Sequence, residues 1–192
     1  MVTTALFVEL IVIGVSATAW VALLVLAIFG YSWLTFERFS SLSTVVPLLS
    51  LSYLLGIITD RFADRLFEPA SSRLLTRWFA SQSDYRHAQS LVYADERFQA
   101  LAEYSKSRLR ICRGSAVNCV LLSIALNMFV WLQLPIELPR AKLSIVGSVL
   151  LILVGLGALS AWYQLCVAGY ERLHQQAMLL GAIEGKPTNG SS

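Results

Sequence analysis

The sequence predicts an all-α integral membrane protein with four transmembrane helices arranged as two antiparallel hairpins. Hydrophobic residues make up 56% of its 192 residues and charged residues only 14%, and the charges lie between four uncharged runs. The four runs are Leu10–Phe36, Phe39–Thr59, Gly114–Ile136 and Leu143–Tyr170. Each is long enough to cross a hydrocarbon core of about 30 Å, which needs roughly 20 apolar residues in a helix.

The first run follows a short apolar stretch and a single acidic residue, Glu9. No basic residue precedes the run, which is also too long for the apolar part of a signal peptide, so we expect it to remain as a transmembrane helix. Glu9 is the candidate for an intramembrane acid, because an ionisable side chain in the bilayer is costly unless it is paired. Alternatively, Glu9 lies at the helix start and reaches lipid headgroups.

The second run is rich in hydroxyl groups around Pro47, among them Thr44 and Ser50. The third run carries Ser123 and Asn127, whose four-residue spacing places them on one face of a helix. Small polar side chains in membrane helices either form hydrogen bonds between helices or line a polar path. The sequence leaves both interpretations open, and these five residues are the candidates for lining or gating a pore.

The helix of the second run is expected to continue past the membrane until Pro69 ends it. This extension carries acidic residues at four-residue spacing beside two arginines at the same spacing. The residues are Asp60, Asp64, Glu68, Arg61 and Arg65. They form either charged rings at the inner mouth of a symmetric pore, or ion pairs of Asp64 with Arg61 and of Glu68 with Arg65 on a solvated helix face.

After Pro69, Ser71 or Ser72 is expected to cap a short helix that lies in the membrane interface. A further helix is expected to begin near Asp95 and to continue into the third span. Basic and aromatic residues close to the interface are predicted to contact lipid headgroups. These residues are Arg73, Arg77, Trp78, Arg108, Arg110 and Arg113.

The distribution of basic residues predicts the orientation. Ten of the fifteen Lys and Arg residues lie in segment 60–113, and such segments stay in the cytoplasm. Both termini are therefore predicted to be cytoplasmic, in the plasma (inner) membrane, and the short outer links Glu37–Arg38 and Glu137–Lys142 make each helix pair a hairpin. The predicted division is a first hairpin (1–59), a cytoplasmic helical segment (60–113), a second hairpin (114–170), and a cytoplasmic helix with a flexible tail (171–192).

Several classes of site are not predicted. The only histidines, His87 and His174, lie outside the four runs, so no haem is expected between paired intramembrane histidines. Spacings typical of catalytic, metal or cofactor sites are not found, and none of these sites is predicted. The excess of basic residues in segment 60–113 is explained by topology, so nucleic acid is not an expected partner.

The leading hypothesis is a homo-oligomeric pore or ion-conducting channel with a cytoplasmic helical collar, in contact with membrane lipids. The first alternative is a non-conducting membrane subunit or scaffold that binds a partner protein or lipid at the cytoplasmic face. The second alternative is a membrane-embedded enzyme acting on a lipid headgroup, which would require Glu9, Asp60, Asp64 or His87 to converge.

Overall fold

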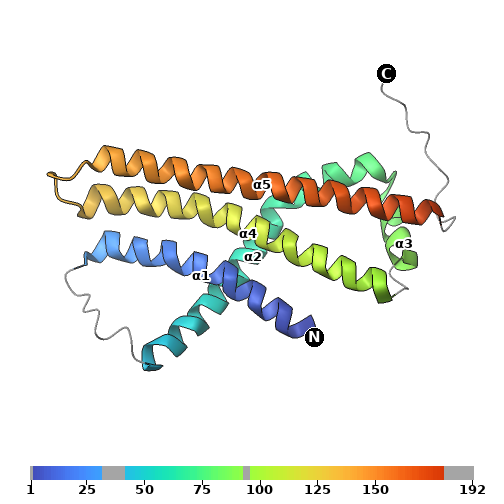
Figure 1. Ribbon diagram of the computed structural model, residues 1–192, viewed down its shortest axis with the longest axis horizontal. Helices are drawn as coiled ribbons and strands as arrows, with labels where there is room; N and C mark the ends of the chain where they lie inside the picture. The colour runs from blue at the N-terminus through green and yellow to red at the C-terminus, as the bar shows by residue number, and fades with distance from the viewer. Residues whose placement is uncertain (1, 32–41, 93–95, 180–192) are drawn as a thin grey trace, which may run out of the picture.

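The computed structural model describes residues 2–31, 42–92 and 96–179, and every regular element in these ranges is a helix (Figure 1). The helices are α1 (Val2–Phe29), α2 (Leu42–Trp78), α3 (Gln82–Val92), α4 (Glu96–Gln133) and α5 (Arg140–Leu179). All except α3 are long and apolar enough to cross a membrane. The predicted all-α class with four candidate spans is therefore confirmed.

The four long helices expose large apolar side chains. On α5, for example, Ile145 is 62% exposed, Ile152 54% and Leu153 60%. A continuous apolar surface of this kind is unfavourable in water, whereas in a bilayer it contacts acyl chains, and the helical backbone satisfies its own polar groups. The fold therefore has the surface of an integral membrane protein.

Helices α4 and α5 form an antiparallel pair joined by a short link (Figure 1). They approach closely, since a Cβ added at Gly155 would lie 3.3 Å from Cβ of Cys119. Arg140 Nε donates a hydrogen bond to the Pro135 carbonyl at 3.2 Å across the link. Arg140 and Lys142 thus belong to the first turn of α5, whereas the sequence placed them in the link.

Helix α1 lies against α4. The side chain of Ile13 covers Gly114, where an added Cβ would be 2.9 Å from Ile13 Cγ2. At the other end of the contact, Gln133 Nε2 donates a hydrogen bond to the Ala27 carbonyl at 2.8 Å. The two helices are therefore attached to each other along most of α1.

The limits of α1 differ from those of the first uncharged run. The helix begins at Val2, so Glu9 lies within it, and it ends at Phe29 and not at Phe36. Gly30 ends the helix in a left-handed conformation with φ of 73°, and its N–H bonds to the Leu26 carbonyl at 3.0 Å. Residues 32–36 and the link Glu37–Arg38 lie outside the described ranges.

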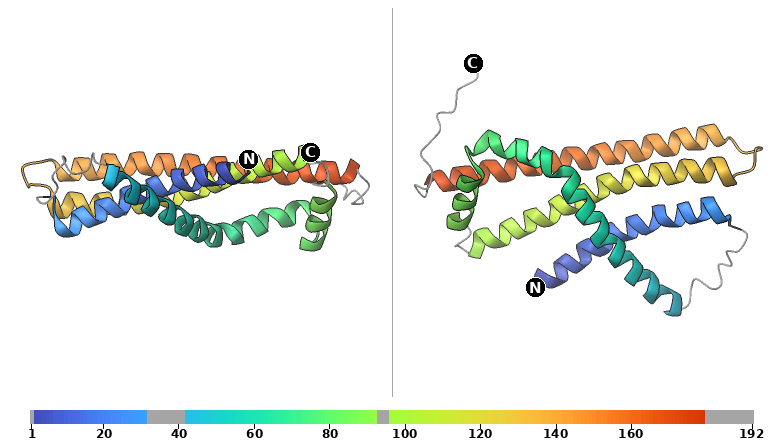
Figure 2. Two further views of the ribbon diagram at one scale, coloured as in Figure 1. Left: turned by 90° about the horizontal axis from the view of Figure 1, so that it is seen from below. Right: turned by 180° about the vertical axis from the view of Figure 1, so that it is seen from behind.

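Helices α1 and α2 cross at two glycines (Figure 2). A Cβ added at Gly14 would overlap the Ser52 carbonyl, and one added at Gly56 would overlap the Leu10 carbonyl. Beside the crossing, the Thr18 and Ser52 hydroxyl oxygens are 2.8 Å apart. The backbones can touch here only because neither glycine has a side chain.

The prediction that Pro69 ends the helix of the second span is wrong, because α2 continues through it for nine further residues to Trp78. Proline removes one backbone hydrogen bond and crowds the preceding turn, but packing on α5 holds this part of α2. The Ser71 and Tyr170 hydroxyl oxygens are 2.9 Å apart, and Figure 2 shows α2 bent between its crossing with α1 and its C-terminal end.

The last turn of α2, helix α3 and the end of α5 share a small apolar core. Its buried residues are Phe79, Ala88, Val92, Leu173 and Ala177. Trp78 and Leu75 pack against this core, so the apolar face that the sequence assigned to a separate interfacial helix is used for contacts within the protein. The core attaches α3 to the long helices.

Helix α3 was not predicted, although its start carries a recognisable signal. The Ser81 hydroxyl accepts a hydrogen bond from the Asp84 N–H at 3.1 Å, as in a capping box. The other predicted extensions are confirmed: α4 begins at Glu96 and continues through the third span, and α5 extends past His174 to Leu179.

Candidate functional site

Polar side chains at membrane depth contact other helices of the same chain. Asn118 of α4 is buried, and its Nδ2 donates to the Ile13 carbonyl at 2.9 Å while its Oδ1 accepts from Trp20 Nε1 at 3.2 Å. Both partners lie on α1, so this single amide bridges α1 and α4. Hydrogen bonds of this kind between membrane helices stabilise their packing.

Asn127 plays the corresponding role between α4 and α5. Its Nδ2 donates to the Ser123 carbonyl and to the Ser148 hydroxyl, each at 2.7 Å, and its Oδ1 accepts from the Ser144 hydroxyl. Asn127, predicted with Ser123 to line or gate a pore, therefore lies at the α4–α5 interface. The bonds of Asn127 to Ser144 and Ser148 are thus contacts between helices, whereas Ser123, on the same helix, contributes its backbone carbonyl.

The remaining pore candidates lie on the N-terminal part of α2. All residues from Val45 to Leu51 are exposed, including Pro47 and Ser50, and the Ser50 hydroxyl donates to the Val46 carbonyl at 3.1 Å. Thr44 is half-buried. This part of α2 projects away from α4 and α5 (Figures 1 and 2), so these candidates do not face the described parts of those two helices.

Two ion pairs attach α1 and α2 to the basic half of α4. Glu9 is 7% exposed, and its Oε2 lies 3.4 Å from Arg110 Nη1. Asp64 Oδ1 lies 2.6 Å from Arg113 Nη1. Glu9 therefore lies within α1 and is paired with a basic residue of α4, and the intramembrane role proposed for it stays a prediction.

The predicted ion pairs along α2 are not formed. Asp64 pairs with α4 and not with Arg61, while Arg61, Arg65 and Glu68 are exposed and form no ion pair with any side chain that the structure describes. Asp60 is half-buried, and its Oδ1 has no hydrogen-bond partner among the described residues. Of the three acidic residues at four-residue spacing, Asp60 and Asp64 are thus half-buried and Glu68 is on the surface.

The arrangement brings together few of the groups needed for the enzyme hypothesis. Glu9 and Asp64 are each held by an arginine, and His87 is exposed on α3. Within residues 2–31, 42–92 and 96–179, no three His, Cys, Asp or Glu side chains lie close enough together to hold a metal ion.

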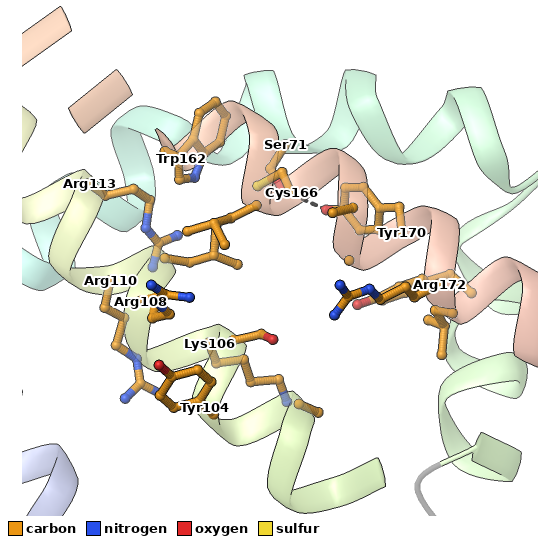
Figure 3. Close-up of a pocket in the computed structure, with 18 of the residues that line it drawn as sticks. Ser71, Tyr104, Lys106, Arg108, Arg110, Arg113, Trp162, Cys166, Tyr170 and Arg172 are labelled. Carbon is orange, nitrogen blue, oxygen red and sulfur yellow. Dashed lines mark hydrogen bonds between the residues drawn. The ribbon is translucent and has the colours of Figure 1, made fainter. Parts of the chain in front are cut away.

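A cavity of about 580 Å³ lies at the end of the bundle where α2, α3, the start of α4 and the end of α5 meet (Figure 3). We call this region the arginine-rich end. Among the side chains that the structure describes, the basic residues that line the cavity are Lys106, Arg108, Arg110, Arg113 and Arg172, and the acidic one is Asp64. These side chains carry an excess of positive charge, part of which Glu9 and Asp64 neutralise.

The cationic groups enter the cavity from two helices. Figure 3 shows Arg108 of α4 and Arg172 of α5 extending into the opening from opposite sides. Arg108 Cζ lies 5.3 Å from the centre of the Tyr104 ring, a cation–π contact that orients the guanidinium without neutralising it. On the wall towards the membrane, Trp162 and Cys166 are buried.

The predicted headgroup contacts fall into two groups. Arg108, Arg110 and Arg113 line the cavity, whereas Arg73 and Arg77 are exposed on α2 outside it. Trp78 is not directed to the surface. It packs against the small apolar core, and its ring centre is 6.2 Å from that of His174.

None of the α5 residues that line the cavity is in the set predicted from sequence, and they include Trp162, Tyr170 and Arg172. The signal that could find them is the register of the second hairpin. Antiparallel helices that share a short link bring residues at equal distances from the link together. Counted from Gln133 and Arg140, this rule places Trp162 opposite the basic residues of α4, and Arg172 about two helical turns further from the link than Arg108.

Together, the fold and this cavity define a polytopic all-α membrane protein with a basic cavity at one end of its helices. Comparison with known proteins adds no relative: no protein-family model matches the chain, and neither curated proteins nor solved structures give a significant match.

Proposed function

We propose that this chain is a non-conducting membrane subunit that binds an anionic ligand at its arginine-rich end, which faces the cytoplasm. The observation that carries the proposal is the cavity of about 580 Å³, which is lined, among the described side chains, by five basic ones and one acidic one. Concave sites with convergent polar groups are the usual places of ligand binding, and the positive-inside rule supports a cytoplasmic position for this end.

The contacts at membrane depth support a binding role over conduction by the single chain. Asn118, Asn127 and Ser52 use their side chains in hydrogen bonds between helices. Polar groups that already form hydrogen bonds between helices hold the helices together. They do not coordinate a passing ion in place of its hydration shell, as the lining of an ion channel does. The helices of one chain then serve as a rigid support for the cavity.

The proposal is tested by photocrosslinking at two matched tyrosines in the full-length protein in cells. Tyr104 lines the cavity and is 61% exposed, whereas Tyr163 lies outside it on α5 and is 47% exposed. With p-benzoylphenylalanine at each position in turn, we expect a discrete adduct at position 104 that is absent at 163. Identical adducts at both positions would overturn the proposal. The absence of an adduct at 104 would overturn it if inorganic phosphate, which has no C–H bond for the crosslinker to attack, also fails to bind.

A homo-oligomeric pore is the second candidate, and the exposed N-terminal part of α2 favours it. If several copies placed this part around an axis, Ser50 would line the path and Pro47 would weaken the helix beside it. A strictly monomeric protein in detergent argues against this candidate. Ion flux in proteoliposomes that is lost in Ser50→Leu, but kept in the matched lipid-facing variant Ser160→Leu, would establish the pore and contradict the non-conducting subunit.

A further inference from the structure

We propose that the cavity at the arginine-rich end binds a phosphate group, held between Arg108 of α4 and Arg172 of α5. This inference deepens the proposed function and rests on it, because it names the chemical class of the anion. The phosphate belongs either to an acidic lipid headgroup or to a soluble phosphorylated molecule, and both sources present the same oxygen atoms to the protein.

The ion pairs of the cavity single out these two arginines. Arg110 and Arg113 are engaged by Glu9 at 3.4 Å and by Asp64 at 2.6 Å. Neither Arg108 nor Arg172 forms an ion pair with any carboxylate among the side chains that the structure describes. An incoming anion can therefore neutralise their charges without breaking an ion pair that the structure describes.

The direction of the two side chains fits phosphate better than carboxylate. Figure 3 shows Arg108 and Arg172 on opposite sides of one opening. A guanidinium binds two oxygens of one group through parallel N–H donors, so a carboxylate matches one arginine. A phosphate, with its tetrahedral oxygens, can engage two arginines from opposite sides. The Tyr170 and Ser71 hydroxyls, which line the cavity 2.9 Å apart, share one hydrogen between them and leave one O–H as a further donor.

The rest of the lining suits a ligand that also has an apolar part. Leu109, Leu165 and Trp162 line the cavity beside the charges, and Trp162 is in edge contact with Phe67 of α2, with ring centres 4.9 Å apart. This wall faces the membrane-spanning portions of α4 and α5. A lipid headgroup with its glycerol region would meet both surfaces at once.

The binding test uses two probes and the full-length protein in detergent or vesicles. Radiolabelled inorganic phosphate reports binding of a soluble anion. Reconstitution into vesicles of phosphatidylcholine, with or without added phosphatidic acid, followed by mass spectrometry of the lipid retained by the purified protein, reports binding of a headgroup. Saturable binding in the first arm assigns a soluble ligand, and selective retention in the second arm alone assigns a lipid.

Charge-matched variants separate the cavity from general attraction to a basic surface. We expect Arg108→Gln and Arg172→Gln each to weaken binding by about ten- to hundredfold, the effect of removing a hydrogen-bonded charge. Arg73→Gln and Arg77→Gln remove the same charge from exposed positions outside the cavity and should leave binding within about twofold. Equal losses in both sets would overturn the inference.

A second pair of variants changes the shape of the cavity but not its charge. Gly169 lines the cavity and Gly157 does not, and an added Cβ would meet nothing within 4 Å at either position. We expect Gly169→Trp to abolish binding and Gly157→Trp to leave it unchanged, with both proteins keeping the helical content and elution volume of the parent. Unchanged binding in Gly169→Trp would overturn the inference, since the anion would then lie elsewhere.

The inference and the proposed function fail in different ways. If the crosslinker at Tyr104 gives a discrete adduct but neither phosphate nor phosphatidic acid binds saturably, the cavity is a binding site for another class of ligand and only the inference is wrong. If no adduct forms at Tyr104 and neither probe binds, both are wrong.

Discussion

The crossing of α1 and α2 offers the clearest quantitative prediction. A Cβ at Gly56 would overlap the Leu10 carbonyl oxygen and lie 3.2 Å from the backbone nitrogen of Gly14. Because both of these neighbours are backbone atoms, no rotation of a side chain can relieve the overlap. Gly56→Ala must therefore move the two helices apart, and the Thr18–Ser52 contact of 2.8 Å beside the crossing is then lengthened.

The magnitude follows from two opposing terms. Overpacking a tight contact lowers the stability of the fold by about 1–3 kcal/mol, whereas replacing glycine by alanine inside a helix raises it by up to about 1 kcal/mol. Gly157→Ala provides the matched control. A Cβ at Gly157 would meet nothing within 4 Å, and this substitution raises the helix propensity by the same amount as Gly56→Ala. The difference between the two variants isolates the crossing, and we expect Gly56→Ala to be less stable than Gly157→Ala by about 1–3 kcal/mol.

The assay is unfolding by SDS in mixed micelles, followed by far-UV circular dichroism and by tryptophan fluorescence, from which the free energy of unfolding is obtained for each variant. Coincident transitions from the two probes are needed for this free energy to be defined. Equal stabilities of Gly56→Ala and Gly157→Ala would refute the reasoning, because α1 and α2 would then not touch through their backbones at this point.

Three further predictions can be checked on the same material. Asn118→Ala removes both hydrogen bonds between α4 and α1 and should lower the free energy of unfolding by about 1–3 kcal/mol in the SDS assay. Glu9→Ala leaves a half-buried arginine unpaired and should lower the free energy of unfolding by about 1–3 kcal/mol. Glu68 is exposed, and Glu68→Ala should change this free energy by no more than about 0.5 kcal/mol. Similar losses in the two variants would contradict the ion pair. In a variant without native cysteines, an impermeant maleimide added to intact cells should label Ile136→Cys and not Ser83→Cys, and the reverse pattern would invert the proposed topology.

The long helices were predictable because their signals are local. An uncharged run of sufficient length is enough to indicate a membrane-spanning helix, and basic residues mark its ends. The errors arose where distant residues decide. Pro69 has the local character of a helix end, but contacts of α2 with α5, such as Ser71 with Tyr170, keep the chain helical beyond it. The early end of α1 depends on a single left-handed glycine, Gly30.

The candidate site was predictable only in part, for the same reason. The sequence identified Arg108, Arg110 and Arg113 as a basic group near the interface, but it could not say which acids would neutralise them. The i,i+3 rule selected Arg61 as the partner of Asp64, although the partner in the structure is Arg113 of another helix. Surface pairs along one helix contribute little, so a half-buried partner on a neighbouring helix easily displaces them.

The basic residues of α4 therefore have two different roles, and helical spacing separates them. Arg110 and Arg113 are three residues apart and share a face, and their acids come from α1 and α2. Arg108 lies on a neighbouring face above Tyr104, four residues earlier, and extends into the cavity that Arg172 enters from α5. The first pair attaches α1 and α2 to α4. The register of α5 against α4 is fixed elsewhere, by the bonds of Asn127 to Ser144 and Ser148. In the proposed site, that second register is what positions Arg108 and Arg172, on separate helices, for one ligand.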